Sequence, residues 1–366
     1  MKRQTQFMLI ILALNVINVL TLWSALHTPE GAFAVDIFTK QLFWMIAGWV
    51  LLWAVSHMNH RSFYDGAVVF YLLAAVFLLM VMHVGDTRLG AQRWIGIGAF
   101  SFQPSEFAKI AAMLMLSRAL CRDRSTEMVK PTFFDEIIKP FLPTSVLFVF
   151  IFLQPDLGTA LVILFMYVLL LLANRITFRS LLIIGCVAAI VVPAGWLVMK
   201  PYQKQRIFTF LDPEKDPLGS GYNIIQSKIA VGSGGVWGKG WMAGTQNQLD
   251  FIPERHTDFI FATFSEERGF VGCAAILMLF FALLRLILTS AERISDPFTY
   301  NLCIGIFSLF FIHCSVNMGM VMGLLPVVGI PLAFFSYGGS YMLLNFFLSG
   351  LFLGILNAED EQGRGR

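Results

Sequence analysis

The segment LDFIPERHTDFIF, residues 249–261, carries the side chains of this chain that are best suited to acid–base chemistry. Four ionisable residues stand directly before an apolar run: Glu254, Arg255, His256 and Asp258. A carboxylate held there could act as a general base, and burying ionisable groups beside an apolar run costs free energy, which makes them candidates for function. The alternative is structural. Thr257 or Asp258 could cap the helix that follows, since its dipole favours an acid at that end.

A second charged group lies in FQPSEFAKIAA, residues 102–112. Pro104 suits the first turn of a helix, and Glu106 and Lys109 are three residues apart, so they share one face of it. An early-turn acid followed by a structural ion pair is the simpler interpretation. Because the rest of this run is apolar, we expect both charges to face the bundle interior or a wet cavity.

Further polar residues lie at the ends of apolar runs. Arg93 and Trp94 stand together in GAQRWIGIG, where a Trp is typical of the aromatic belt at a membrane interface. Asp156 follows a proline in QPDLGT, and we predict that it caps the next helix. Three consecutive charged residues follow within the next apolar run: Glu266, Glu267 and Arg268. They could form a structural cluster in which the charges neutralise one another, or they could belong to a functional site.

Motifs of soluble proteins are incomplete in this sequence. Gly238-Lys239 resembles the end of a phosphate loop, but the required Ser or Thr does not follow. The alternating acids of residues 212–216 resemble a calcium loop, but Pro217 stands where the loop needs glycine. His256 has no second histidine at zinc-ligand spacing. We therefore identify no cofactor, and only a divalent cation (Mg or Mn) remains open.

The elements that must position these residues are membrane helices. Hydrophobic residues make up 57% of the chain and charged residues only 13%, and the mean hydropathy is +0.72. Apolar runs of about 17–25 residues can span a bilayer. We predict an all-α polytopic membrane protein, one domain over residues 1–366, with ten transmembrane helices: Phe7–Leu26, Gln41–Ser56, Gly66–Val84, Gln103–Leu120, Ile137–Leu153, Leu157–Ala173, Ser180–Val198, Phe259–Leu288, Phe298–Met318 and Tyr337–Leu356.

The distribution of Lys and Arg predicts the orientation, because cytoplasmic loops are enriched in them. With the N-terminus inside, the short outer loops hold only Lys40, Arg88 and Arg93. The inner ends hold the rest of those counted: Lys2, Arg3, Arg61, Arg118, Arg122, Arg124, Lys130, Lys139, Arg175, Arg179, Arg285, Arg293, Arg364 and Arg366. Both termini are then cytoplasmic. The net charge of +3 reflects this bias, and nothing indicates a nucleic-acid partner.

One large extracytoplasmic loop, residues 199–258, is expected between the seventh and eighth helices. Tyr222–Val231 has a helical pattern and could lie along the membrane surface, and the glycines that follow favour an irregular, tightly turning backbone. No cysteine lies in this loop, so no disulfide braces it. The last outer loop, GLLPVVGIPLAFFSYGGS, mixes Pro and Gly with apolar residues, which requires non-helical backbone covered by protein or lining a cavity.

Six blocks in this order identify a family resemblance: GAQRWI, QPSEFAKI, QPDLGTA, DPxxDPLGSGYNIIQSKIAVGSGG, GTQNQLDFIPERHTDFIF and PxxFxSYGGS. Together they resemble the SEDS family (shape, elongation, division and sporulation), and IIQSKIAVGSGG with GTQNQLDFIPERHTDF is more similar to its elongation members than to its division members. The resemblance covers about residues 90–340. It implies a peptidoglycan glycosyltransferase of the bacterial inner membrane that polymerises lipid II, an undecaprenyl-pyrophosphate-linked disaccharide pentapeptide.

The resemblance also implies roles for residues and partners. The family's catalytic acid falls on Asp258, its sensitive tryptophan on Trp94, and its fourth-span acid and base on Glu106 and Lys109. The elongation members act with a class B penicillin-binding protein, a transpeptidase, and with other elongation-complex proteins. An α-linked donor that becomes a β-linked product predicts one inverting displacement with one base. Four basic residues are candidates for binding the departing phosphates, and the sequence does not rank them: Arg93, Arg206, Lys228 and Arg255.

Two other functions remain open at this stage. A lipid II flippase would also suit paired charges such as Glu106 and Lys109. Transport sites usually lie near the membrane midplane between repeats, whereas the charges here gather at the outer face. A non-catalytic scaffold of the elongation machinery leaves the polar cluster around Asp258 unexplained.

Overall fold

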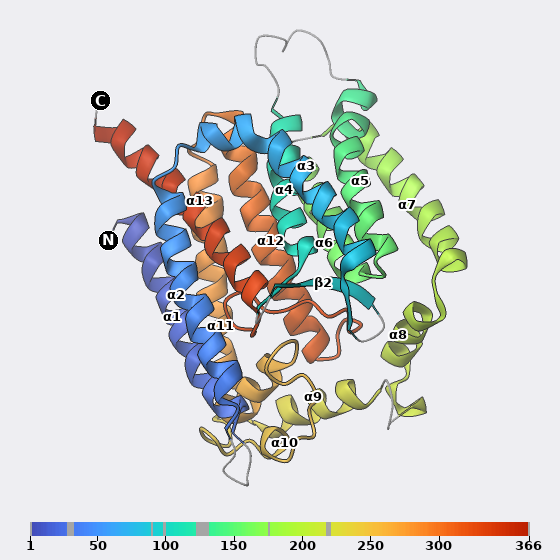
Figure 1. Ribbon diagram of the computed structural model, residues 1–366, viewed down its shortest axis with the longest axis vertical. Coiled ribbons are helices and arrows are strands. Elements are labelled where there is room, and N and C mark those ends of the chain that lie inside the picture. The colour runs from blue at the N-terminus through green and yellow to red at the C-terminus, as the bar shows by residue number, and fades with distance from the viewer. Residues whose placement is uncertain are drawn as a thin grey trace.

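The computed structural model describes residues 2–27, 33–88, 91–97, 100–121, 132–174, 176–216 and 221–364. Five of the basic residues that predict the orientation lie outside these ranges: Arg122, Arg124, Lys130, Arg175 and Arg366. The chain forms one bundle of long helices, with both termini at one end and the short helices of the large loop at the other (Figure 1).

The long helices of the bundle are α1 (Arg3–Ala25), α2 (Val35–Ser56), α3 (His60–Val84), α4 (Pro104–Ala119), α5 (Lys139–Leu153), α6 (Leu157–Ala173), α7 (Phe178–Val198), α11 (Ile260–Ala291), α12 (Pro297–Val321) and α13 (Gly339–Arg364). Each overlaps one of the ten predicted spans. Within the described residues, seven helices are long and apolar enough to cross a membrane, and α4, α6 and α7 are not among them. The all-α polytopic class is therefore confirmed, whereas the count of ten crossings stays a prediction.

The burial of each helix follows its place in the bundle. α12 lies at the centre, and 78% of its most apolar 18-residue stretch is buried (Figure 1). On α2 only 22% of the corresponding stretch is buried, and Ile46 and Trp53 are exposed. Apolar side chains on an outer face of a membrane bundle contact lipid, so their exposure carries no penalty there. α7 stands at the edge of the bundle with Leu182, Ile190 and Leu197 exposed in the same way (Figure 1).

The loop between α3 and α4 contains strands that the sequence does not predict. A three-stranded antiparallel sheet forms from β1 (Asp86–Arg88), β2 (Ala91–Ile97) and β3 (Phe100–Phe102). In its register Asp86 pairs with Trp94, and Ile95 pairs with Phe102. β3 leads directly into α4, whose first residue is Pro104, as predicted. The sheet thereby holds Arg93 and Trp94 over the start of α4.

The large loop contains α8 (Pro201–Leu211), a 3-10 turn (Pro213–Lys215), α9 (Tyr222–Ser233) and α10 (Thr245–Gln248). The helix predicted over Tyr222–Val231 is thus confirmed as α9, its position along the membrane surface stays a prediction, and the glycine-rich stretch after it is a series of turns. These helices lie at the end of the bundle opposite the termini (Figure 1).

A break in α11 anchors this loop to the bundle. Gly269 has φ 60° and ψ −162°, which interrupts the helix that the sequence predicts to be continuous. The backbone groups freed by the break bond to the glycine-rich turns: Phe270 N to Gly235 O at 2.9 Å, Val271 N to Val236 O at 3.1 Å, Lys239 N to Glu266 O at 3.0 Å and Gly240 N to Glu267 O at 3.1 Å. The loop therefore satisfies polar backbone that lipid could not.

The charges beside this break pair differently from the expected cluster. Glu266 is fully buried and pairs with Lys239 of the loop, Oε1 to Nζ 2.6 Å, and not with Arg268. Thr245 Oγ1 and Gln246 N also donate to Glu266, each at 3.1 Å. This buried carboxylate therefore fixes both the turns and α10 to α11.

The segment between α12 and α13, residues 322–338, is non-helical and its second half is buried, as the sequence predicts. Its backbone is satisfied by side chains of the bundle, because Asn317 Nδ2 donates to Ile330 O at 2.8 Å and Tyr341 OH donates to Pro331 O at 3.0 Å. Tyr337 N donates to His256 O at 2.9 Å. The segment therefore lies directly against the stretch that carries Asp258.

Candidate active site

Asp258 lies two residues before α11 and its side chain is half-buried. The capping alternative is not supported, because Phe259 is the N-cap of α11 and no side chain caps that end. Instead Asn317 Nδ2 donates to Asp258 O at 2.9 Å. The carboxylate faces the non-helical segment, where a Cβ built on Gly329 would lie 3.5 Å from its Oδ2. Its oxygens are therefore not committed to the start of the helix.

The surroundings of Asp258 make it a stronger base than an ordinary aspartate. Its pKa is raised to about 6, mainly by burial and also by the negative charges of Glu254 and Asp156, against the lowering effect of the nearby Arg206. A carboxyl with a pKa of about 6 is roughly nine-tenths ionised at neutral pH and still holds a proton better than a solvated carboxylate does. This is the combination that a general base requires.

A cavity of about 130 Å³ lies near this position, since two of its lining residues, Asp156 and Arg206, interact electrostatically with Asp258. Its charged residues are Arg93, Asp156 and Arg206, and its apolar walls come from the α6 turn, α8 and the non-helical segment: Pro155, Leu157, Gly158, Leu161, Met199, Ile207, Pro326 and Val328, with Gln203. Gly158 permits the close approach of α6 to this segment, since a Cβ there would lie 2.5 Å from Val328 O. Four segments far apart in the sequence, β2 among them, thus enclose one charged space.

Asp156 caps α6 and pairs with Arg93. Its Oδ1 accepts from Thr159 N at 3.3 Å, which confirms the predicted cap of α6. Arg93 Nη1 lies 3.8 Å from the same carboxylate, and Arg93 Nε donates to Gln154 O at 3.3 Å. Arg93 is thus held by the turn between α5 and α6, whereas Arg206 on α8 is exposed at the cavity edge.

Glu106 and Lys109 form the predicted ion pair, with Oε2 and Nζ 2.8 Å apart and both side chains nearly fully buried. Lys109 Nζ also lies 3.0 Å from His313 Nε2 and sits over the ring of Tyr341. Ser105 Oγ, next to the pair, reaches Asp156 Oδ2 at 3.5 Å. The start of α4 therefore carries both the buried ion pair and a polar contact to the wall of the cavity.

The remaining candidates lie around the site in other roles. Arg255 points away from the cavity, since its Nε donates to Ala25 O at 2.7 Å and its guanidinium pairs with Asp250. Lys228 is exposed and its chain crosses Gly323 at the end of α12. The ring of His256 is tilted by 60° against that of Tyr337, 5.8 Å between centroids, and burial lowers the pKa of His256. Trp94 is half-buried in β2.

The structure adds residues that the sequence analysis passed over. His313 and Asn317 stand four residues apart on α12, both buried, and bond to Pro331 O and Ile330 O respectively. Isolated polar residues at i and i+4 in an apolar span share one face, and this spacing is the signal that could have identified them.

The site holds few groups for a metal ion. Among the described residues no three His, Cys, Asp or Glu side chains gather at metal-ligand spacing. Mg²⁺ is commonly held by one or two carboxylates together with substrate phosphates, so Asp156 and Asp258 are the residues here that fit such an ion. A divalent cation stays a prediction.

These features define a class, a polytopic helical membrane protein with a charged site at one end of its bundle. The family model of the cell cycle proteins FtsW, RodA and SpoVE matches residues 4–361. The chain belongs to this family, which is the one identified from its motifs.

Two curated relatives cover nearly the whole chain. It is 39% identical over 338 residues to the peptidoglycan glycosyltransferase MrdB of Escherichia coli K12, which covers 92% of this chain and 89% of that protein. It is 30% identical over 420 residues to the peptidoglycan glycosyltransferase RodA of Treponema pallidum, over 95% and 96% of the two chains.

Solved structures share the fold. A chain of a peptidoglycan synthase complex that coordinates polymerization and crosslinking superposes with a TM-score of 0.80 at 30% identity, over 96% of this chain and 97% of that one. The rod shape determining protein RodA of Thermus thermophilus superposes with a TM-score of 0.69 at 25% identity, over 96% and 95% of the two chains.

Proposed function

We propose that the chain is a peptidoglycan glycosyltransferase that polymerises lipid II for cell-wall elongation, with Asp258 as the general base. One observation supports this assignment above the others. A half-buried carboxylate with a pKa of about 6 serves no cap and stands beside a cavity bordered by Arg93 and Arg206. The curated relatives that match nearly the whole chain carry the same activity in their names.

The proposed step is a single displacement. The 4-hydroxyl oxygen of the acceptor sugar bonds to the anomeric carbon of the donor while the bond from that carbon to the pyrophosphate oxygen breaks. Asp258 takes the hydroxyl proton, and the pyrophosphate leaves with the bonding electron pair. Attack from the opposite face inverts an α-linked donor to a β-linked product, so one base is sufficient.

The leaving pyrophosphate gains charge as the bond breaks, so cations near it stabilise the transition state. Arg206 fits this role best, because its exposed guanidinium borders the cavity and interacts electrostatically with Asp258. Arg93 is bonded to the α5–α6 turn and fits the role of a fixed positive wall. Arg255 does not fit a phosphate-binding role, because its contacts with Ala25 and Asp250 direct it away from the cavity.

The proposal includes a partner and a side of the membrane. A class B penicillin-binding protein would cross-link the new strand, in keeping with the synthase complex that shares this fold.

The site faces outward, because the inner ends of the spans carry most of the Lys and Arg. Lys215 is suited to test this, since 82% of its side chain is exposed. Lys215→Cys should react with an impermeant thiol reagent on intact spheroplasts, and reaction only after lysis would reverse the orientation.

The activity is tested with purified protein, lipid II and the cognate transpeptidase, by separating glycan strands on a gel. Asp258→Asn should reduce strand formation about 10²–10⁴-fold while lipid II binding is retained. Glu214→Gln is the matched control, an acid-to-amide change at an exposed position of the same outer loop, and should polymerise normally. A flippase or scaffold predicts no strands from the unaltered chain under any of these conditions.

A further inference from the structure

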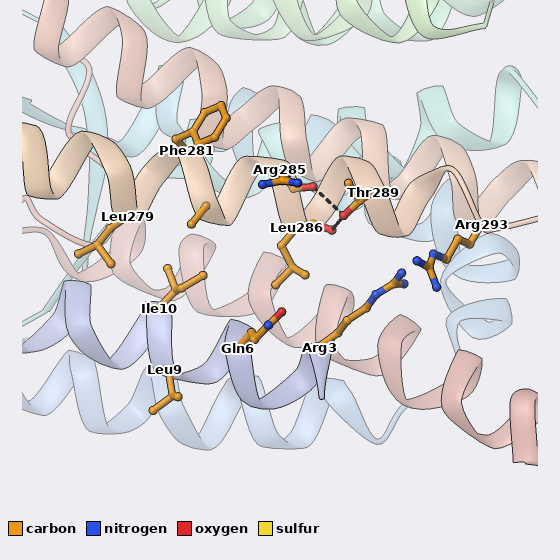
Figure 2. Close-up of a pocket in the computed structure, with 11 residues that line it drawn as sticks. Arg3, Gln6, Leu9, Ile10, Leu279, Phe281, Arg285, Leu286, Thr289 and Arg293 are labelled. Carbon is orange, nitrogen blue, oxygen red and sulfur yellow. Dashed lines mark hydrogen bonds between the residues drawn. The ribbon is translucent and has the colours of Figure 1, made fainter. Parts of the chain in front are cut away.

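A groove of about 710 Å³ opens at the other end of the molecule, between α1 and α11 near both termini (Figure 2). It is lined by Arg3, Gln6, Leu9 and Ile10 of α1, by Leu279, Phe281, Ala282, Arg285, Leu286 and Thr289 of α11, and by Arg293 just beyond α11. Its volume is in the range of pockets that hold small molecules. None of these residues belongs to the candidate active site, which lies at the far end of α11.

One end of the groove is strongly basic. In Figure 2 the guanidinium groups of Arg3 and Arg293 point toward one another, and Arg285 lies further along α11, apart from this pair. Glu359 lies 3.6 Å from Arg3 and interacts electrostatically with Arg293 as well. Within the described part of the chain, Arg285 and Arg293 form no ion pair, so the arginines of this groove outnumber the carboxylates that pair with them.

The other end of the groove is apolar and open. Leu279, Ala282 and Leu286 recur at three- and four-residue spacing along α11, opposite Leu9 and Ile10 of α1. Leu9 is 49% exposed and Phe281 is 66% exposed, so these walls face the hydrocarbon of the bilayer. An occupant that matches both ends has an anionic head and an apolar tail.

We infer that this groove binds an anionic phospholipid of the leaflet next to the termini. The lipid phosphate lies between Arg3 and Arg293, Arg285 adds positive charge to the same groove, and an acyl chain runs along the wall of α11. Basic pockets between membrane helices on the cytoplasmic side are suited to such head groups, and each arginine near an anionic surface contributes about 1 kcal/mol, a factor of roughly five in affinity. A transmembrane helix of another protein would leave the unpaired arginines without counter-charge.

Native mass spectrometry of the purified full-length chain in detergent tests the inference, with phosphatidylglycerol and phosphatidylcholine as probes. The unaltered chain should retain phosphatidylglycerol in preference to phosphatidylcholine. Arg285→Gln with Arg293→Gln should weaken phosphatidylglycerol binding about 30-fold. The matched control is Arg61→Gln with Arg179→Gln, which removes the same charge from exposed positions at the same end of the molecule and should bind normally.

A second variant distinguishes lipid binding in the groove from nonspecific attraction of an anionic lipid to basic residues. Ala282→Phe adds bulk to an exposed wall residue without changing charge, and should also reduce phosphatidylglycerol binding while thermal stability is kept. Equal retention of both lipids, equal binding by the charge variant and its control, or full displacement of phosphatidylglycerol by 10-fold excess inorganic phosphate would overturn the inference.

Discussion

Lys109 Nζ lies 3.0 Å from Nε2 of His313, in the interior of the bundle. An ammonium group can only donate, so Nε2 must accept and carries no proton. The proton is then on Nδ1, which lies 3.1 Å from Pro331 O and donates to it. A neutral histidine of one defined tautomer therefore connects the Glu106–Lys109 pair to the non-helical segment that packs against Asp258.

This arrangement predicts the behaviour of the ion pair. Glu106→Ala or Lys109→Ala strands a buried charge, which typically costs about 3–5 kcal/mol, so each should lower thermal stability and abundance strongly. Glu106→Leu with Lys109→Met removes both charges and should recover most of the stability. Melting curves of the three variants are the measurement. Single variants of normal stability and activity would show that the pair has no role.

The double variant also separates structure from function. If the pair shapes the substrate cavity, the stable double variant should still polymerise lipid II poorly. Full activity of that variant would mean that the pair serves folding alone. The sequence predicted the pair from its spacing, but it could not identify His313, because one polar residue scarcely changes the hydropathy of an apolar run.

The break in α11 predicts a large effect of a small substitution. Gly269→Ala would place a Cβ 2.3 Å from Gly238 N at a φ of 60°, so the loop and the helix would have to separate. Backbone strain of this kind costs about 1–3 kcal/mol before the clash is counted. Gly232→Ala is the matched control, since its Cβ would meet no atom within 4 Å in α9. It should be neutral or slightly stabilising. Comparable melting temperatures for the two variants would contradict this account.

The break also shows where sequence reasoning ends. Apolar runs predict each long helix because length and hydropathy are local properties. Lys239 and Glu266 are 27 positions apart, and only the fold brings them to 2.6 Å. The strands β1 and β3 are three residues each, too short for a periodic pattern to distinguish them from loop. In the site, helical spacing predicts the pairing of Glu106 and Lys109. Arg255 is one of four unranked candidates for the phosphates, and its pairing with Asp250, which the sequence does not reveal, directs it elsewhere.

The charges around Asp258 predict opposite shifts of the pH–rate profile. Polymerisation should fall as pH drops through about 6, because protonated Asp258 cannot accept a proton. Glu254 raises this pKa, so Glu254→Gln should move the acidic limb to lower pH. Arg206 lowers it, so Arg206→Gln should move that limb to higher pH, whatever it does to the maximal rate. Initial rates between pH 5 and 8 give both midpoints, and shifts in the same direction would remove Asp258 as the titrating group.

The same pKa predicts that Asp258 destabilises the fold it serves. Its pKa is about 6 in the folded chain and 3.8 in the unfolded reference, so the folded state binds the proton more tightly. Its contribution to stability is therefore fully present below pH 3.8 and is lost as pH rises through 6. Asp258→Asn cannot ionise and should be more stable than the unaltered chain at pH 7 by roughly 1–3 kcal/mol, with the difference vanishing near pH 4.

A capping role predicts no such gain, because Asn and Asp cap helices about equally well. Melting curves at the two pH values, beside the strand-formation assay, are the measurement. A variant that polymerises poorly and yet melts higher at pH 7 alone would mark Asp258 as a residue retained for chemistry at the expense of stability, and one that melts lower at both pH values would return it to a structural role.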